Sequence, residues 1–411
     1  VGHGAEAVKQ LLGNRAEYAL QEQQLGTGHA VMQAESLLKD EEGITFVLCG
    51  DTPLITSQSL IEMAEAHQRS GAAATVTSAI LSNPKGYGRV VRNQSGSVEK
   101  IVEQKDCTEE EDRIQEINAG MYCFDNKKLF HALQQVTNNN AQNEYYLTDV
   151  IGILRNENEK IEAYVLTEES EAMGVNDRVA LAEAERLMRE RINHKHMLNG
   201  VSFIDPANTY IEADVKLGQD TVIYPGTILR GQTVIGEGCV IGPNADITNS
   251  EIMANVAIKH AVLSDAFVDT QSSIGPYAYL RPNSRVGQRV KIGDFVEIKN
   301  AAIGDDTSIS HLSYVGDAEV GKKVNIGCGA ITVNYDGHSK HRTEIEDGAF
   351  IGSNVNLIAP VKVSKNAYVV AGSTITDAVP EDGFAIARQR QTTKPGYAKK
   401  LRERIEERGK R

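Results

Sequence analysis

The chain lacks tryptophan, and aromatic residues make up only 5% of its 411 residues. A core built on large aromatic side chains is therefore not expected. The chain also lacks any apolar run of the roughly 20 residues that a membrane-spanning helix requires. Its first residues, Val1-Gly2-His3-Gly4, lack the basic and apolar segments of a signal peptide. Since an initiator methionine is missing too, we expect the chain to begin inside a longer protein.

Cysteine is scarce and scattered. The chain has five cysteines and no Cys-x-x-Cys pair: Cys49, Cys107, Cys123, Cys239 and Cys328. This number and spacing argue against a disulfide framework and against a zinc site. The sequence therefore predicts a cytoplasmic protein in a reducing compartment.

Positive charge is also in short supply, with 43 Lys and Arg against 56 Asp and Glu and a net charge of −13. Nucleic-acid binding rests on clustered Lys and Arg that meet phosphates, so a net acidic chain is a poor candidate for general nucleic-acid binding. Segment 394–411 is the exception, with eight Lys or Arg against three Glu. It is either a solvated tail or a contact for a ligand's phosphates or for a neighbouring subunit.

Length and composition are those of a globular protein of two or three domains. Residues 1–178 alternate between strand-like and helix-like segments, which predicts an α/β, Rossmann-like domain with a mixed sheet. Ligands of such domains bind at the carboxyl ends of strands. We expect strands over residues 44–49, 74–80, 120–124 and 162–166, and helices over residues 28–38, 57–70, 127–136 and 147–156.

Residues 177–199 are rich in Ala, Leu, Glu and Arg, contain no Gly or Pro, and are followed by Gly200. This composition predicts a long helix, which we expect to link, over 179–199, a domain of residues 1–178 to one of residues 200–411. His194 and His196 lie on this helix. Because side chains two residues apart on a helix point in different directions, we expect exposed histidines and no metal site.

Aliphatic residues recur every six positions in the C-terminal half, often followed by Gly. Such a hexapeptide repeat predicts a parallel β-helix, in which each short strand buries one aliphatic side chain and stacked coils share a continuous core. The register breaks after Ile247 and returns at Ile274. A polar insertion, residues 333–343, has no inward aliphatic and predicts a binding loop. The repeat positions are Leu217, Ile223, Leu229, Ile235, Ile241 and Ile247, then Ile274, Leu280, Val286, Ile292 and Ile298, then Ile345, Ile351, Leu357, Val363, Val369 and Ile375.

Polar residues that a solenoid does not need lie between residues 281 and 325: Arg281, Lys299, His311, Tyr314 and Asn325. His311 is a candidate general base, because an imidazole titrates near neutral pH. Arg281 and Lys299 are 18 residues apart, which is three hexapeptides or one coil. They should stack on one edge of the β-helix and could together hold a phosphate.

In the first domain, Asp51 follows an apolar strand within Cys49-Gly50-Asp51. A carboxylate at the end of a strand is a common Mg²⁺ ligand in phosphate chemistry, although turn-forming Asp is equally common there. Residues 24–30 form a Gly-rich turn before a helix, which can present backbone N–H groups to an anion. This turn is no dinucleotide fingerprint, because Val31 stands where that motif needs Gly.

The chain resembles the bacterial family of bifunctional N-acetylglucosamine-1-phosphate uridylyltransferase / glucosamine-1-phosphate N-acetyltransferase enzymes. The resemblance covers nearly the whole chain in the family's order. It rests on residues 23–30 (QQLGTGHA), 49–54 (CGDTPL), 86–89 (GYGR), 101–103 (IVE), 116–118 (EIN), 139–142 (NNAQ), 174–178 (GVNDR), 311–318 (HLSYVGDA), 325–329 (NIGCG) and 332–337 (TVNYDG).

The resemblance implies a left-handed β-helix, a homotrimer, Mg²⁺ as cofactor and two reactions that lead to UDP-N-acetylglucosamine for cell-wall synthesis. In acetyl transfer, His311 would act as base. Arg281, Lys299, Tyr314, Asn325 and Lys340 would hold the sugar phosphate. The acetyl-CoA groove would be lined by Cys328, Asn334, Tyr335, Ser353, Ala371 and Arg388.

In uridylyl transfer, Asp51 and Asn176 would bind the metal. The nucleotide and sugar would contact Gln21, Gly26, Thr27, Cys49, Gly50, Asp51, Gly88, Glu103, Asn118 and Asn176. The family's Gly-rich loop and its basic residue precede the first residue of this chain. We therefore expect this chain to acetylate glucosamine-1-phosphate but to make little UDP-sugar.

Two alternatives stay open at this point. The chain could be a single-function sugar nucleotidyltransferase whose β-helix is a scaffold, or a β-helical binding protein without enzymatic activity. The polar group of Arg281, Lys299, His311 and Tyr314 favours the bifunctional enzyme, because a scaffold does not require it.

Overall fold

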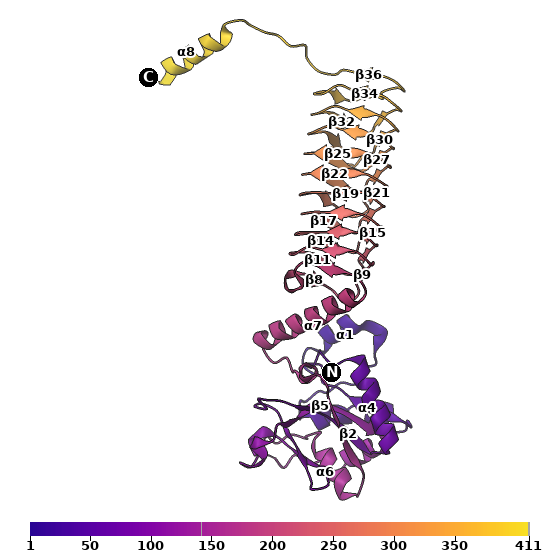
Figure 1. Cartoon of the computed structure of the whole chain (residues 1–411), viewed down its shortest axis with the longest axis vertical. Helices are drawn as coiled ribbons and strands as arrows, with labels where there is room; N and C mark the ends of the chain where they lie inside the picture. The colour runs from indigo at the N-terminus through magenta and orange to yellow at the C-terminus, as the bar shows by residue number, and fades with distance from the viewer. Residues whose placement is uncertain (141, 410–411) are drawn as a thin grey trace. The chain divides into compact units, whose positions relative to one another are not determined.

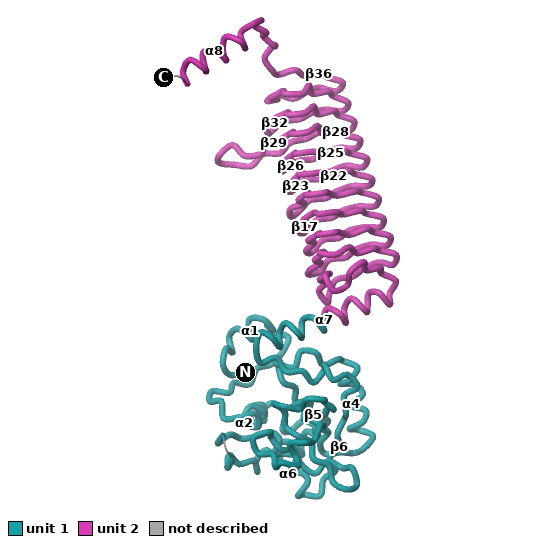
Figure 2. Tube along the Cα trace, turned by 60° about the vertical axis from the view of Figure 1, so that its left-hand side comes forward, with its two compact units in different colours: residues 1–188 teal, residues 189–411 magenta. Residues whose placement is uncertain are grey.

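The computed structural model describes residues 1–140 and 142–409 and divides into two compact units, residues 1–188 and 189–411 (Figure 2). The boundary falls inside the long helix α7 (Arg178–Leu198). Among the described residues, no helix is long and apolar enough to cross a membrane. The five cysteines are free.

The first unit is built on a mixed sheet in the order β4-β3-β5-β2-β6, with β1 also paired to β5. Strand β5 runs antiparallel to β1, β2 and β3, whereas β2 and β6 are parallel. Phe124 of β5 and Val76 of β2 are fully buried in the core against helices α5 and α6. The strands are β1 (Ile44–Val47), β2 (Ala74–Ile80), β3 (Arg89–Arg92), β4 (Val98–Val102), β5 (Glu116–Asp125) and β6 (Ile161–Val165). The helices are α1 (Ala5–Leu12), α2 (Thr27–Met32), α3 (Glu35–Leu38), α4 (Ser57–Ser70), α5 (Asn126–Leu133) and α6 (Asp149–Asn156).

The predicted helix 57–70 and strand 74–80 coincide with α4 and β2. Helix α4 begins where the Thr56 side chain accepts a hydrogen bond from the Ser59 N–H, and ends at Gly71 in the left-handed region. The predicted helix 28–38 is wrong as one element. The N–H groups of Gln33 and Ala34 bond three residues back, and this tighter turn separates α2 from α3. Helix α1 and the hairpin of β3 and β4 were not predicted.

The second unit is a parallel β-helix of three sheets with 11, 10 and 9 strands, running from β7 (Ser202–Phe203) to β36 (Phe384–Ala385) (Figure 1). The strands are two to four residues long. Ile223, Ile241, Ile258 and Ile274 lie in register on successive coils and point into the core. The six-residue period therefore predicted the architecture and the inward residues correctly.

The register break after Ile247 does not interrupt the solenoid. Ile252, Ile258, Leu263 and Val268 continue the buried core, with several steps of five residues in place of six. The shorter steps remove one residue from a turn and leave the strand register intact. Because of these five-residue steps, the buried residues between Ile247 and Ile274 do not fit an exact period of six.

The last part of helix α7 lies against the start of the β-helix. Ile192 packs on the β-helix core, and Asn193 donates hydrogen bonds to the carbonyl oxygens of Pro206 (2.9 Å) and Thr209 (3.1 Å). The expectation of an exposed His196 is wrong, because its ring is buried there and burial lowers its pKa. The basic tail contains an exposed helix, α8 (Tyr397–Gly409), and its residues 410 and 411 lie outside the described residues.

Candidate active sites

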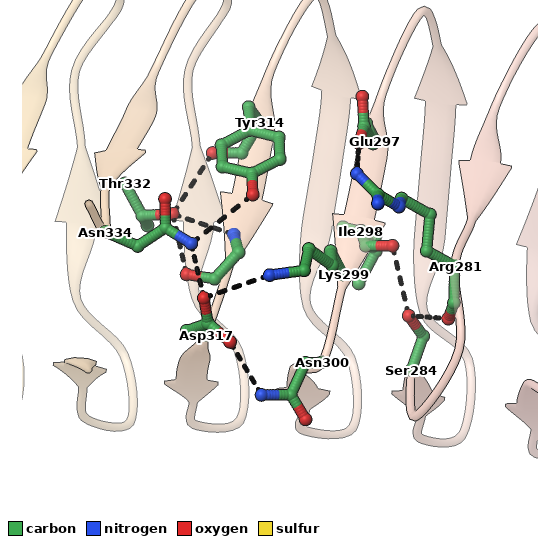
Figure 3. A network of polar contacts seen from close by, with 11 residues as sticks. Arg281, Ser284, Glu297, Ile298, Lys299, Asn300, Tyr314, Asp317, Thr332 and Asn334 are labelled. Atoms are coloured by element: carbon green, nitrogen blue, oxygen red, sulfur yellow. Dashed lines mark hydrogen bonds and ion pairs between the residues drawn. The ribbon is translucent and has the colours of Figure 1, made fainter. Parts of the chain in front are cut away.

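The phosphate candidates Arg281 and Lys299 lie on neighbouring coils, as their spacing predicts. Strands β20 (Tyr279–Leu280) and β23 (Glu297–Lys299) pair in parallel with Leu280 opposite Ile298. The Arg281 N–H bonds to the Ile298 carbonyl at 2.8 Å. Both cations therefore leave the same edge of the solenoid (Figure 3).

Each of these cations has a carboxylate partner. Arg281 Nη1 lies 2.8 Å from Glu297 Oε1, and this hydrogen bond raises the pKa of Arg281. Lys299 Nζ lies 3.3 Å from Asp317 Oδ2, with both side chains largely buried. These pairs hold the two cations in place before any ligand binds.

Lys340, from the predicted binding loop, joins this cluster. The pKa of Lys340 is lowered, chiefly by its side-chain contact with Lys299 and also by Arg281. Three cations against the two carboxylates of Glu297 and Asp317 leave positive charge at this spot, which favours an anion such as a phosphate.

Asp317 is the hub of a polar network that sequence reasoning missed (Figure 3). Besides Lys299, it accepts hydrogen bonds from Asn300 Nδ2 at 2.6 Å and from Asn334 Nδ2. Asn334 Nδ2 also lies 3.4 Å from the Tyr314 hydroxyl oxygen. Burial would raise the pKa of Asp317, but these hydrogen bonds together lower it and keep the carboxylate charged. The sequence signal that could have indicated this contact is the spacing of 17 residues between Asn300 and Asp317, which is one short coil.

His311 is paired with an aspartate that sequence reasoning also missed. His311 ends β25 (Ser308–His311) and lies in register with Asp294, which ends β22 (Lys291–Asp294). The two side chains meet at 2.5 Å between His311 Nδ1 and Asp294 Oδ1. This hydrogen bond is the chief reason that the pKa of Asp294 is lowered. Both side chains are accessible to solvent.

Four of the six residues expected at the acetyl-CoA groove lie along one corner of the β-helix, whereas Asn334 and Tyr335 belong to the loop after β29. Cys328, Ser353 and Ala371 each follow an in-register strand residue by two positions, and backbone hydrogen bonds connect their turns coil by coil. The Arg388 side chain lies beside Gly372, at the next coil. Asn325 lies exposed on a sheet face, at the start of β28 (Asn325–Ile326). Tyr335 is exposed in the loop and forms a backbone bridge with Lys340.

In the first unit, Asp51 and Asn176 come together because the Val175 N–H bonds to the Asp51 carbonyl at 2.7 Å. Both side chains are exposed. Among the described residues, no three His, Cys, Asp or Glu side chains gather as a metal site. A carboxylate and an amide oxygen suit Mg²⁺, which usually takes its remaining ligands from water and phosphate. These two residues therefore fit a magnesium ion that is shared with a nucleotide.

Gln21, Gly26 and Thr27 form one group at the start of α2. Gln21 Nε2 donates to the Gly26 carbonyl at 3.2 Å, and Thr27 Oγ1 accepts from the Leu147 N–H at 3.1 Å. Gly26 has φ of 110°, and a Cβ there would lie 2.6 Å from the Tyr145 carbonyl oxygen. Only glycine allows this close approach.

Gly88, Glu103 and Asn118 form a second group. The Asn118 N–H bonds to the Gly88 carbonyl at 2.9 Å, and a Cβ on Gly88 would lie 3.5 Å from Glu103 Oε2. Burial, followed by the nearby Asp106 and Asp149, raises the pKa of Glu103. Gly50 is exposed beside Cys49, whose thiol donates to the Gly120 carbonyl. Burial and the nearby Asp51 raise the pKa of Cys49, so this thiol stays protonated near neutral pH.

Comparison with known proteins gives matches along most of the chain. Residues 5–171 match the nucleotidyl transferase family, residues 214–249 the bacterial transferase hexapeptide family (six repeats), and residues 262–336 the GMPPB C-terminal domain family. The chain is 58% identical over 401 residues to a bifunctional protein GlmU of Geobacillus sp. (strain WCH70), covering 98% of this chain and 87% of that relative. It is 57% identical to that of Brevibacillus brevis, with the same coverage, and 55% identical to that of Bacillus velezensis, covering 98% and 88%.

Proposed function

The chain belongs to the family of bifunctional GlmU proteins, and from that premise we propose which of its residues carry each reaction. Its two activities are acetyl transfer from acetyl-CoA to glucosamine-1-phosphate, and uridylyl transfer from UTP to N-acetylglucosamine-1-phosphate with release of pyrophosphate. Membership of this family sets aside the scaffold and the non-enzymatic alternatives. The expectation that this chain makes little UDP-sugar stays a prediction.

The observation that carries the acetyltransferase assignment is the pair of His311 and Asp294. When Asp294 Oδ1 accepts the Nδ1 proton of His311, the unprotonated nitrogen of this exposed side chain is Nε2. In our proposal Nε2 takes a proton from the substrate amine as its nitrogen attacks the thioester carbonyl. The C–N bond forms, the C–S bond breaks, and the CoA thiolate recovers a proton.

Binding of the two substrates follows from the same edge of the solenoid. Arg281, Lys299 and Lys340 would hold the phosphate of the sugar, because their summed charge needs an anion. Tyr314 and Asn325 would contact the amino sugar. Acetyl-CoA would lie along the corner of Cys328, Ser353 and Ala371, with Asn334, Tyr335 and Arg388 as further contacts.

For uridylyl transfer we propose that Asp51 and Asn176 bind Mg²⁺, which neutralises charge on the nucleotide's phosphates when bound. Gln21, Gly26 and Thr27 would contact the nucleotide. The sugar would lie against Gly88, Glu103 and Asn118, with Cys49 and Gly50 lining the site. The contribution of these residues is positioning, which is the main need in phosphoryl transfer.

We also propose that the β-helix forms a trimer. His260, Tyr277 and Phe295 stack on one corner, with ring centroids 5.4 and 5.3 Å apart, and all three have positive φ. Tyr277 and Phe295 are each 56% exposed. Bulky residues in the left-handed region are uncommon, and a contiguous exposed apolar patch usually marks an interface. A closed cyclic trimer would cover it.

The test of the acetyltransferase assignment is CoA release from acetyl-CoA and glucosamine-1-phosphate. His311→Ala is expected to lower kcat by about 10²–10⁴, with little change in the KM of either substrate. A kcat near that of the unsubstituted protein would refute His311 as the base. If His311→Ala lowers kcat because the variant unfolds, its Tm will also be lower than that of the unsubstituted protein.

A further inference from the structure

Asp317 lies at a buried corner between β26 (Tyr314–Gly316) and β27 (Ala318–Val320), in the left-handed region with φ of 46°. Both carboxylate oxygens are occupied. Oδ1 accepts from Asn300, and Oδ2 meets Lys299 and Asn334 (Figure 3). These donors come from the coil before Asp317 and from the coil after it. The carboxylate therefore ties three successive coils together at the phosphate candidate Lys299.

The backbone of Asp317 is tied in the same way. Its N–H bonds to the Lys299 carbonyl at 2.9 Å, and its carbonyl accepts from the Thr343 N–H at 3.1 Å. Asn334 and Thr343 are the two ends of the loop that projects from the β-helix after β29 (Ile331–Val333) (Figure 2). Asp317 thus holds one end of this loop by its side chain and the other by its backbone.

The loop itself is internally ordered. Asp336 accepts hydrogen bonds from the N–H groups of His338 (2.8 Å) and Ser339 (2.6 Å) and contacts His341 Nε2 at 2.7 Å. The His341 N–H donates a hydrogen bond to the Asn334 carbonyl at 2.8 Å, which closes the loop where it leaves the β-helix. A loop with its own hydrogen bonds moves as a unit when its base is released, so the position of Lys340 depends on the anchor.

We propose that Asp317 is a positioning residue of the acetyltransferase site, which anchors the base of the 334–342 loop and thereby holds Lys340 beside Lys299 for the substrate's phosphate. Nothing in the catalytic chemistry requires this carboxylate. The role of this carboxylate is to hold the cations of Lys299 and Lys340 side by side despite their mutual repulsion. The inference rests on the proposed phosphate role of Lys299 and Lys340.

The sharpest variant is Asp317→Asn. Asn tolerates positive φ and has the size of Asp, so the backbone of the corner is kept while the charge is lost. Its NH₂ group cannot accept a hydrogen bond, so the donors on one side of the carboxylate, either Asn300 or the pair of Lys299 and Asn334, lose their acceptor. We expect KM for glucosamine-1-phosphate to rise about tenfold, the loss of one charge-assisted contact. Lys340→Ala should then add little in the Asp317→Asn background, whereas each change alone raises KM.

Limited trypsin cleavage gives a readout that does not depend on activity. Lys340 and Arg342 are exposed cleavage sites in the loop. Release of the anchor should speed cleavage at these two sites about tenfold, in proportion to the lost contact, with the cut bonds identified by mass spectrometry. Asn334→Ala removes the side-chain link from the other end and should speed the same cleavage, which covers the case in which Asp317→Asn does not fold.

Asp306→Asn is the matched control. Asp306 also has positive φ, at 61°, and its carboxylate pairs with Arg289 one coil earlier, away from the loop. It should change neither KM nor cleavage in the loop. If Lys340→Ala leaves KM unchanged, the proposed phosphate role of Lys340 fails. If Lys340→Ala raises KM but Asp317→Asn acts additively with it, or leaves loop cleavage unchanged, the anchoring role of Asp317 is overturned.

Discussion

At the scale of single residues, the proposed acetyltransferase site consists of charged side chains that meet because one coil separates them. Asp294 and His311 are 17 residues apart, and Lys299 and Asp317 are 18 apart. The β-helix turns such spacings into direct contacts. A residue can therefore be assigned a partner by counting along the chain, once the length of the local coil is known.

Asp294→Asn tests whether the hydrogen bond with Asp294 assists His311 as the base. We expect kcat to fall about tenfold to a hundredfold, less than for His311→Ala, because the ring loses its preferred tautomer but keeps its nitrogen. KM should change little. Since the hydrogen bond from His311 lowers the pKa of Asp294, its carboxylate is charged at neutral pH. Steady-state kinetics at neutral pH measure kcat and KM, and an unchanged kcat would contradict the role.

Arg281→Ala and Lys299→Ala test phosphate recognition. Each should raise KM for glucosamine-1-phosphate by about tenfold or more, since a charge-assisted contact is lost, and should change KM for acetyl-CoA much less. Arg289→Ala, at another edge of the solenoid, serves as the control. Equal effects on both substrates would indicate a structural role for these two cations.

At the scale of elements, most strands of the β-helix stabilise the fold by burying an aliphatic side chain. Ile292 of β22 is fully buried two residues before Asp294. Ile292→Ala should lower the free energy of unfolding by about 2–5 kcal/mol, through lost burial and a new cavity. Lys291→Ala, on the same strand but facing outward, should change it by less than about 0.5 kcal/mol. Chemical denaturation measures both, and similar values would contradict the inward assignment.

At the scale of the whole molecule, the exposed corner of His260, Tyr277 and Phe295 predicts self-association. Sedimentation at micromolar concentration should show a trimer, and a monomer would contradict it. Tyr277→Asn should weaken association without unfolding the coil, because Asn keeps the positive φ of 58° but removes the aromatic surface. Lys323→Asn, at a corner with φ of 56°, is the control and should leave the trimer intact.

The two activities should be separable, because their candidate residues lie in different compact units. In a longer chain that carries the Gly-rich loop and its basic residue, Asp51→Ala is expected to abolish pyrophosphate release from UTP and N-acetylglucosamine-1-phosphate, through loss of a metal ligand, and to leave CoA release unchanged. His311→Ala should do the reverse. Parallel assays of both products on each variant decide the matter, and loss of both activities in either variant would contradict the separation.

The sequence by itself determined the β-helix, because the aliphatic residues that its strands bury form a repeat. This repeat can be recognised in the sequence without any knowledge of contacts. It also determined helix α4, whose cap residues Thr56 and Gly71 are local signals, and the stacking of Arg281 on Lys299. Only the tertiary structure decided the partners of these residues. The sequence did not single out Asp294 or Asp317. The spacing is 17 residues from Asp294 to His311 and from Asn300 to Asp317, in place of 18, and no local feature of the sequence marks which coils are shortened.

The same reason explains the remaining differences. The five-residue steps after Ile247, the burial of His196 and the break between α2 and α3 all depend on what the chain packs against, and local propensity does not record it. The anchoring of the Lys340 loop depends on hydrogen bonds between successive coils, from Asn334 and Thr343 to Asp317. The aliphatic repeat determined the β-helix, while the contacts between coils determined which side chains meet at the proposed site.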